Sequence, residues 1–257
     1  MKKLKILLGL SLLGCVCEVY GMKRPNTHFP IHKKIDIWSN SAIYKAICEG
    51  AKEVVQLILS DKVDFSTCDE FGNTMLHFAI SKANESAEHA SIANMLIRAY
   101  KLANKDIDQV NNKGNSPLHL AAENGCAGMV ASLIRTHAYV KRTNIDGITP
   151  LHLACSRNGN VFVVEQLVRA GADVNAYDKV GCTPLFYAIA AEKTDIVRFL
   201  LSNGADVKNA RAQHAMLYVA CALGNKEIAK MLISAGVVVT EDLDRKSTRL
   251  NSSHGKL

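Results

Sequence analysis

Tryptophan and proline are scarce in this chain, and long stretches of loop-forming residues are few. Its 257 residues include one Trp and five Pro, whereas Ala and Leu are plentiful, a composition that favours helices over sheets. Hydrophobic residues make up 48% of the chain, enough to bury a sizeable core, so disorder is not the expected state. The composition predicts a folded, largely helical protein.

The common signatures of catalysis are also absent. Residues 22–243 contain no Gly-x-Ser-x-Gly elbow, no phosphate-cradling Gly-Lys-Ser loop, and no Ser or Cys patterned with a His and an acid, the arrangements that nucleophilic catalysis and phosphate binding commonly use. We therefore expect no catalytic residues, no cofactor and no small-molecule substrate.

A dense Lys/Arg stripe is missing, although the formal net charge is +7 at pH 7. Residues 1–21 hold three Lys against one Glu, and residues 244–257 hold four basic residues against one Asp, which leaves +2 for residues 22–243. A body so close to neutral gives little support to nucleic-acid binding. No nucleic-acid partner is expected.

The amino terminus has the pattern of a secretion signal. Met1–Lys5 is basic, and the apolar run Ile6–Leu13 is too short to cross a bilayer. Val19 and Gly21 are small enough for the −3 and −1 sites of a signal peptidase. We predict that residues 1–21 are a signal peptide and that the body is exported, either to a periplasm or out of the cell.

Two alternatives for this segment remain open. The sequence Leu12-Leu13-Gly14-Cys15 resembles the lipobox of bacterial lipoproteins, so Cys15 is an alternative site of lipid anchoring, and only then would the protein attach to a membrane. An uncleaved amino-terminal anchor is the other alternative. All three hypotheses place the body, which follows a linker over residues 22–35, outside the cytoplasm of its maker.

The carboxyl-terminal segment, residues 244–257, resembles the translation of a widely used sequencing adapter over Asp244-Arg245-Lys246-Ser247-Thr248-Arg249-Leu250-Asn251-Ser252-Ser253-His254. We therefore interpret it as a non-native tail and exclude it from the fold. Any domain that followed Leu243 in the natural chain would then not be visible in this sequence.

One pattern recurs six times along the chain. It is clearest as Ser116-Pro117-Leu118-His119, Thr149-Pro150-Leu151-His152 and Thr183-Pro184-Leu185-Phe186, and weaker copies begin at Ser41, Thr74 and Ala215. The starts are 33, 42, 33, 34 and 32 residues apart. Insertions of five and four residues in the second unit explain the one long spacing, so the underlying period is 33.

This pattern resembles the ankyrin repeat, and the resemblance covers residues 36–243. Further family features are glycines between the helices, at Gly50, Gly125, Gly159 and Gly224, and the runs Gly171-Ala172-Asp173-Val174-Asn175 and Gly204-Ala205-Asp206-Val207. The fold that the resemblance implies is an all-α solenoid of six stacked helix-turn-helix units, with hairpin-like loops projecting to the next unit.

The residues predict the same architecture by themselves. Ser or Thr followed by Pro begins a helix, because the hydroxyl caps free N–H groups and Pro occupies a first-turn position where no N–H partner exists. Apolar runs predict a second helix in each unit, with core side chains at Val54, Val55, Leu57, Ile58, Met129, Val130, Leu133, Ile134, Ile196, Val197, Leu200 and Leu201. Such short pairs cannot hide an apolar face alone, so they must stack.

Eight cysteines in an exported chain raise the question of disulfides, but two lie in the signal region and the other six form no CxxC pair. Cys155 and Cys221 take the place of a small residue on the first helix, beside Ala79, Ala121 and Ala188, so we expect packing roles and no disulfide framework. Cys68 and Cys182, near loop tips, are the expected exposed thiols.

His77, His119 and His152 recur once per unit. The resemblance implies a structural histidine that hydrogen-bonds beside the capping Thr or Ser. A metal ladder is not expected, since units about 8 to 10 Å apart cannot all place donors within about 2.1 Å of one zinc ion. The insertion at residues 84–90 is expected to be tolerated loop growth, although a role in shaping the binding surface remains open.

The resemblance implies that loop-tip and first-helix positions on a concave face carry specificity. The predicted partner-binding residues are Glu70, Phe71, Asn73, Ser81, Lys82, Asn112, Lys113, Asn115, Glu123, Asn124, Ile145, Asp146, Ile148, Ser156, Arg157, Lys179 and Val180. Their mixture of apolar, amide and charged side chains suits a protein surface.

The expected function is that of a non-enzymatic scaffold, exported and binding an unknown protein through this face. One hypothesis is a bacterium that presents the scaffold to proteins of a eukaryotic host. An alternative is the targeting region of a larger enzyme or effector whose other domain lay beyond Leu243. Self-association through the terminal units is a third.

Overall fold

The computed structural model describes residues 43–59, 63–156, 158–207 and 210–237, with Leu57 and residues 210–214 described by backbone alone. All of these belong to one compact unit within Asn40–Leu257. The predicted signal peptide (1–21), Cys15, the linker (22–35), the tail (244–257), Ser41 and Arg157 lie outside the described residues.

The described chain is made of short helices in pairs. The first helices of the six units are residues 43–48, α4 (Met75–Lys82), α6 (Pro117–Glu123), α8 (Pro150–Ala154), α10 (Pro184–Ala190) and α12 (Ala210–Ala222). The second helices are α3 (Lys52–Leu59), α5 (Ala87–Leu102), α7 (Ala127–Arg135), α9 (Val161–Arg169), α11 (Thr194–Ser202) and α13 (Lys226–Ser234). Apart from one isolated bridge between Cys68 and Thr74, these described residues form no β-structure, which confirms the predicted all-α solenoid.

The first helices begin where the Thr/Ser signal predicts. Thr149 is the N-cap of α8, its hydroxyl accepts a hydrogen bond from the backbone N–H of His152, and Pro150 fills the first helical position. Thr or Ser stands at the same place before α4, α6 and α10. Because the cap satisfies a backbone N–H and Pro has none to satisfy, the helix can begin only there.

The second helices supply much of the core, with three buried side chains on a typical helix where four were predicted. On α7, Val130 and Leu133 are fully buried and Met129 nearly so. The half-buried members of the predicted set are Val54, Ile58, Ile134 and Leu201. Successive residues on a helix are about 100° apart, so side chains such as Ile134 and Leu201, one position past a buried leucine, lie at the edge of the buried face. Each fully buried side chain contributes about 1.5 to 3 kcal/mol.

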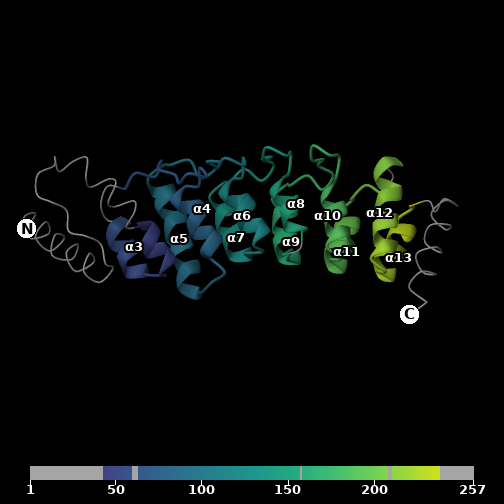
Figure 1. Cartoon of the computed structure of the whole chain (residues 1–257), viewed down its shortest axis with the longest axis horizontal. Helices are drawn as coiled ribbons and strands as arrows, with labels where there is room; N and C mark the ends of the chain where they lie inside the picture. The colour runs from purple at the N-terminus through teal and green to yellow at the C-terminus, as the bar shows by residue number, and fades with distance from the viewer. Residues whose placement is uncertain (1–42, 60–62, 157, 208–209, 238–257) are drawn as a thin grey trace, which may run out of the picture. The chain divides into compact units, whose positions relative to one another are not determined.

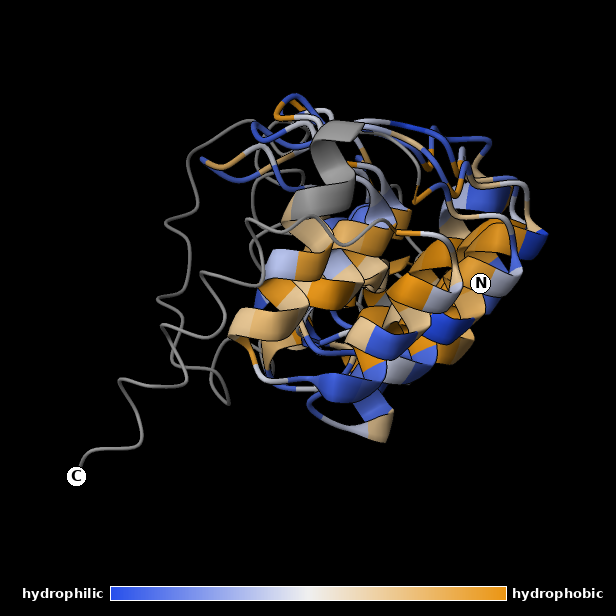
Figure 2. Ribbon diagram, turned by 90° about the vertical axis from the view of Figure 1, so that its right-hand side faces the viewer, coloured by the Kyte–Doolittle hydropathy of each residue, from blue (hydrophilic) through white to orange (hydrophobic). Residues whose placement is uncertain are grey.

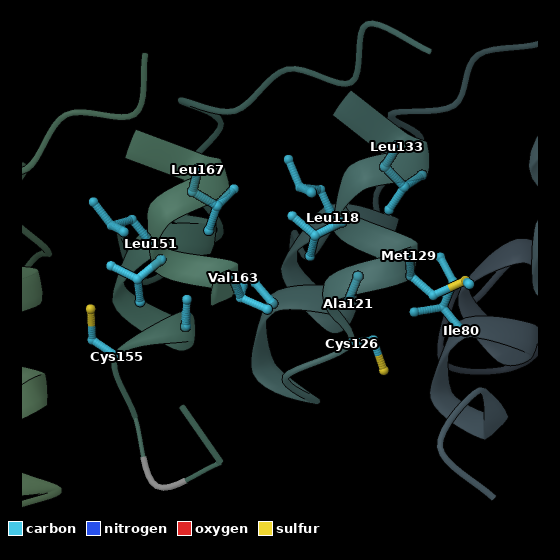
Figure 3. Close-up of a cluster of buried hydrophobic side chains, with 14 of the residues drawn as sticks. Ile80, Leu118, Ala121, Cys126, Met129, Leu133, Leu151, Cys155, Val163 and Leu167 are labelled. Atoms are coloured by element: carbon cyan, nitrogen blue, oxygen red, sulfur yellow. The ribbon is translucent and has the colours of Figure 1, made fainter. Parts of the chain in front are cut away.

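The units stack in chain order, as Figure 1 shows. Each first helix from α4 to α12 packs against its own second helix, and each from α4 to α10 packs against the first helix of the next unit. The second helices form a parallel row of contacts from α3 to α13. Leu118 and Leu133 of one unit meet Leu151 and Leu167 of the next in a single cluster (Figure 3). Hydrophobic residues gather on the helices, while the loops along one edge are rich in hydrophilic residues (Figure 2). The core is therefore continuous across the described units.

The insertion in the second unit lengthens a helix. Helix α5 has 16 residues where α7 has 9, and its last turn carries Tyr100, which is fully buried and donates to the Phe65 carbonyl at 3.2 Å. The helix is seven residues longer than α7, which is about two helical turns, so the apolar face keeps its register. Asn84 donates to the Asn124 carbonyl at 2.7 Å and accepts from the Cys126 thiol. The insertion thus enlarges the core and binds the third unit, and is more than tolerated loop growth.

The sixth unit departs from prediction in two ways. Helix α12 begins at Ala210, five residues before the expected start at Ala215. Cys221 is exposed, whereas its counterpart Cys155 is fully buried. This corrects the packing role assigned to Cys221: in earlier units the following unit covers that position, and no described unit follows the sixth.

The recurring histidines join neighbouring units, which confirms their structural role. In the third unit the ring nitrogen Nδ1 of His119 accepts from the Ser116 backbone N–H at 3.1 Å, and Nε2 lies 3.1 Å from the Ile148 carbonyl oxygen of the next unit. His77 and His152 make equivalent bonds. With Nδ1 facing an N–H group, the neutral Nε2–H form fits and a second ring proton does not.

This geometry predicts a loss of stability in mild acid. Burial lowers the pKa of His119 from 6.5 to about 4, so between these values the unfolded chain binds a proton that the folded chain excludes, and the free energy of unfolding falls as the pH falls. In urea titrations between pH 6.5 and 4, His119→Gln should flatten this fall by up to about 1.4 kcal/mol per pH unit. An unchanged slope in the variant would contradict the assignment.

Candidate functional site

Four similar turns precede α4, α6, α8 and α10, and we call residues 69–73, 111–115, 144–148 and 178–182 the fingers. In the third finger the side-chain oxygen of Asn144 accepts from the N–H groups of Asp146 and Ile148, at 2.9 and 3.0 Å. Asp69, Asn111 and Asp178 make the same pair of bonds in their own fingers. An Asn or Asp at the first position therefore folds each finger locally.

Neighbouring fingers are joined at their tips by backbone hydrogen bonds of 2.9 to 3.1 Å, from Asn112 to Phe71, from Ile145 to Lys113 and from Lys179 to Asp146. Asparagine amides add a second row of bonds: Asn111 donates to Asn73 at 2.8 Å and Asn144 to Asn115 at 2.9 Å. The tips are thus held in a regular array before any partner binds.

The structure brings most of the predicted finger residues to the surface. Phe71, Ile145 and Val180 are 63%, 53% and 83% exposed. The polar tip residues Glu70, Asn112, Lys113, Asp146 and Lys179 are exposed, and Asn73 and Ile148 are half-buried. Asn115 is only 8% exposed and its side chain accepts from Asn144, so it positions the fingers and is not available for direct contact.

The predicted first-helix residues lie beside the fingers, but several are engaged within the chain. Ser81 is exposed, and Lys82, Glu123, Asn124 and Ser156 are half-buried. The Lys82 ammonium pairs with Glu85 at 2.7 Å, and the amide of Asn124 donates to the carbonyl of Ile80 at 3.5 Å. The finger tips and these helix positions together form what we call the finger surface.

The fifth unit adds a feature that the sequence prediction missed. A hollow of about 360 Å³ is lined by Ser156, Asp178, Val180, Cys182, Phe186, Tyr187, Ala190 and Ala191. Ala190 and Ala191 stand where the third unit has Glu123 and Asn124. Two small apolar side chains replace two longer polar ones, which leaves room at the surface. In the sequence, the pair Ala190-Ala191 was the feature from which this hollow could have been predicted.

Phe186 also lines the hollow, and the sixth unit, which follows it, has no finger among its described residues. Phe186 takes the place of the structural histidine and is half-buried. Val174 and Val207 end the equivalent Gly-Ala-Asp-Val runs of consecutive units. Eight residues separate Val174 from the helix cap Thr183, whereas only two separate Val207 from α12, which is too few to form a finger. In the second, third and fourth units the histidine Nε2 faces a carbonyl of the following finger. Where no finger follows, a phenylalanine leaves no N–H unpaired.

The described part of the chain holds few features of other kinds of site. Its six cysteines are all free; Cys155 is buried and Cys68 is exposed as predicted, whereas Cys182 is half-buried. Burial raises the pKa of the Cys155 thiol. No group of three or more metal-ligating side chains is present among the described residues. Nor is any described helix both long and apolar enough to cross a membrane.

Family models of ankyrin repeats match residues 41–97, 85–178 and 155–242. The matched segments span most of the chain and coincide with the helix pairs and fingers described above. The chain therefore belongs to the ankyrin-repeat family, whose repeats mediate binding between proteins.

Several animal proteins are similar to it. "Ankyrin repeat and KH domain-containing protein mask-1" of Caenorhabditis elegans is 27% identical over 225 residues, 76% of this chain and 8% of its own length. Mouse "NF-kappa-B inhibitor alpha" is 36% identical over 132 residues, 49% of this chain and 39% of its own. Mouse "B-cell lymphoma 3 protein homolog" is 25% identical over 254 residues, 96% of this chain and 53% of its own. The chain spans about half or less of these relatives.

The tip-to-tip bonds predict a difference between two glycines. Gly147 has φ +77°, and a Cβ added there would lie 2.9 Å from the Lys179 nitrogen; Gly171 has φ +90° and a Cβ there would meet nothing within 4 Å. Both Ala variants should carry the left-handed cost of about 1 to 2 kcal/mol. Gly147→Ala should lose about 1 kcal/mol more, because the added carbon displaces the neighbouring finger.

Urea unfolding of the two variants measures this difference directly, with Gly171→Ala as the matched control. Equal midpoints for Gly147→Ala and Gly171→Ala would show that the tip contact carries no stability.

Proposed function

We propose that this chain is a non-enzymatic scaffold that binds another protein through its finger surface. The observation that carries the proposal is the set of exposed apolar side chains, Phe71, Ile145 and Val180, on a hydrogen-bonded array of tips. Protein interfaces combine a few such apolar anchors with a polar rim. Here the rim consists of charged and amide side chains on the same fingers.

The rigidity of the fingers supports this function. Each tip is fixed by two side-chain bonds within its own finger and by a backbone bond to its neighbour, for example from Ile145 to Lys113 at 3.1 Å. A surface that is ordered before binding loses less conformational entropy when a partner arrives. The membership of the family, and a relative named as an inhibitor, agree with a role in binding.

The proposal includes export, which rests on the sequence of residues 1–21 alone. With a cleaved signal, the finger surface would meet proteins outside the cytoplasm of its maker, and we propose that a protein of a eukaryotic host is the partner. A fusion of residues 1–21 to a reporter that is active only after export tests this part separately. Retention of the reporter in the cytoplasm would remove export from the proposal.

Truncation of two anchors tests the binding surface. The double variant Phe71→Ala and Ile145→Ala should bind a captured partner at least tenfold more weakly, as truncation of a hot-spot residue commonly costs about 2 kcal/mol or more. Thermal unfolding should change little, because both side chains are more than half exposed.

The full chain serves as bait, captured proteins are identified by mass spectrometry, and affinities are measured with the purified partner. Phe162→Ala is the matched control, since Phe162 is 62% exposed on the second helix α9, away from the fingers. A partner that loses affinity with Phe162→Ala and not with the double variant would place binding on the opposite side of the stack.

A further inference from the structure

The hollow in the fifth unit carries a single formal charge. Of the described residues that line it, Asp178 is the one Asp, Glu, Lys or Arg, and the others are apolar, aromatic or uncharged polar residues. Asp178 forms no ion pair within the described part of the chain. Lys179 is its neighbour in sequence but is not among the lining residues. The hollow is therefore mostly apolar, with one carboxylate that has no cationic partner among the described residues.

Tyr187, which also lines the hollow, is hydrogen-bonded to Asp178. Its hydroxyl donates to the carboxylate oxygen Oδ2 of Asp178 at 2.9 Å, so the hydroxyl oxygen presents only lone pairs to the hollow. Burial, followed by the hydrogen bond and the charge of Asp178, raises the pKa of Tyr187 above its usual range. The edge contact with the His152 ring, at 5.2 Å between centroids and 75° between planes, fixes the tyrosine ring.

The carbonyl of Val180 is a further hydrogen-bond acceptor. In the other fingers the carbonyl of the third residue (Phe71, Lys113 or Asp146) accepts an N–H of the next finger. No described residue donates to the equivalent carbonyl of Val180. The Asp178 oxygen Oδ1 is already shared by the N–H groups of Val180 and Cys182. The hollow thus offers aromatic rings and hydrogen-bond acceptors; the Ser156 hydroxyl already donates to the Leu153 carbonyl, and the Cys182 thiol is a weak donor.

We propose that this hollow receives an arginine side chain of the partner protein. An arginine has an aliphatic stem for the alanine floor, a planar cation that stacks on the rings of Phe186 and Tyr187, and donors for Tyr187 Oη and the Val180 carbonyl. The charge of Asp178 complements the guanidinium. An apolar side chain would leave those acceptors unpaired, and lysine lacks the planar face. The inference rests on the proposed function and specifies the chemistry of its partner.

The test uses the full chain with labelled Tyr and Phe rings and three probes: the amides of N-acetyl-arginine, N-acetyl-citrulline and N-acetyl-leucine. Citrulline has nearly the shape of arginine without its charge. NMR titration should show saturable shifts of the Tyr187 ring with the arginine probe, at the millimolar affinity expected for one side chain. The citrulline and leucine probes should bind about tenfold more weakly.

Two variants and a control assign the shifts. Tyr187→Leu installs the residue that the third and fourth units carry at this position, Leu120 and Leu153, and should abolish arginine binding while the chain stays folded. Ala191→Asn installs the residue of the third unit and should weaken binding by filling the hollow. Phe78→Leu makes a similar aromatic replacement in the second unit, outside the hollow, and should leave binding unchanged.

Equal binding of the arginine and citrulline probes, tighter binding of the leucine probe, or no saturable shift would each overturn the proposal. Failure of the wider function is distinguishable. If arginine binds but no partner depends on Phe71 and Ile145, the hollow is selective and the proposed finger surface is wrong. If a partner binds through the fingers and Ala191→Asn leaves its affinity unchanged, only the arginine inference falls.

Discussion

No helix pair in this chain can bury its own apolar face, and every other feature follows from that constraint. Helices of five to nine residues, such as α8 and α7, are too short to be stable alone in water. They persist because each one packs between its partner helix and the helices of adjacent units. Leu118, Leu133, Leu151 and Leu167 form one cluster across two units, so stability belongs to the interfaces between repeats.

The same stacking determines the binding surface. The histidine of one unit lies against a carbonyl of the next finger, and each finger tip after the first donates an N–H to the tip before it. These bonds form only when adjacent units are in register. The exposed tips are therefore ordered by the core beneath them.

The second and fifth units depart from the repeat pattern, and these departures give the chain structural features that the other units lack. The second unit gains extra core through Tyr100, because the seven additional residues of α5 make about two helical turns and preserve the buried face. The fifth unit exchanges its histidine for Phe186 next to the place where the sixth finger is missing. Together with Ala190 and Ala191, that exchange opens a hollow with one charge, Asp178. Irregular units therefore supply the shape and chemistry that identical units would lack.

The sequence by itself determined the repeat period and the helix starts at Thr74, Ser116, Thr149 and Thr183, since caps and short-range periodicity are local properties. The structural histidines and most of the exposed finger tips followed from the resemblance of the sequence to the ankyrin repeat. Only the tertiary structure decided that Asn115 is buried, that Cys221 is exposed and Cys155 is not, that α12 begins at Ala210, and that a hollow forms beside Phe186. Each of these depends on whether a neighbouring unit covers the residue. The residues of a neighbouring unit lie about thirty positions away in the chain, so a local sequence pattern does not show whether they cover a given side chain.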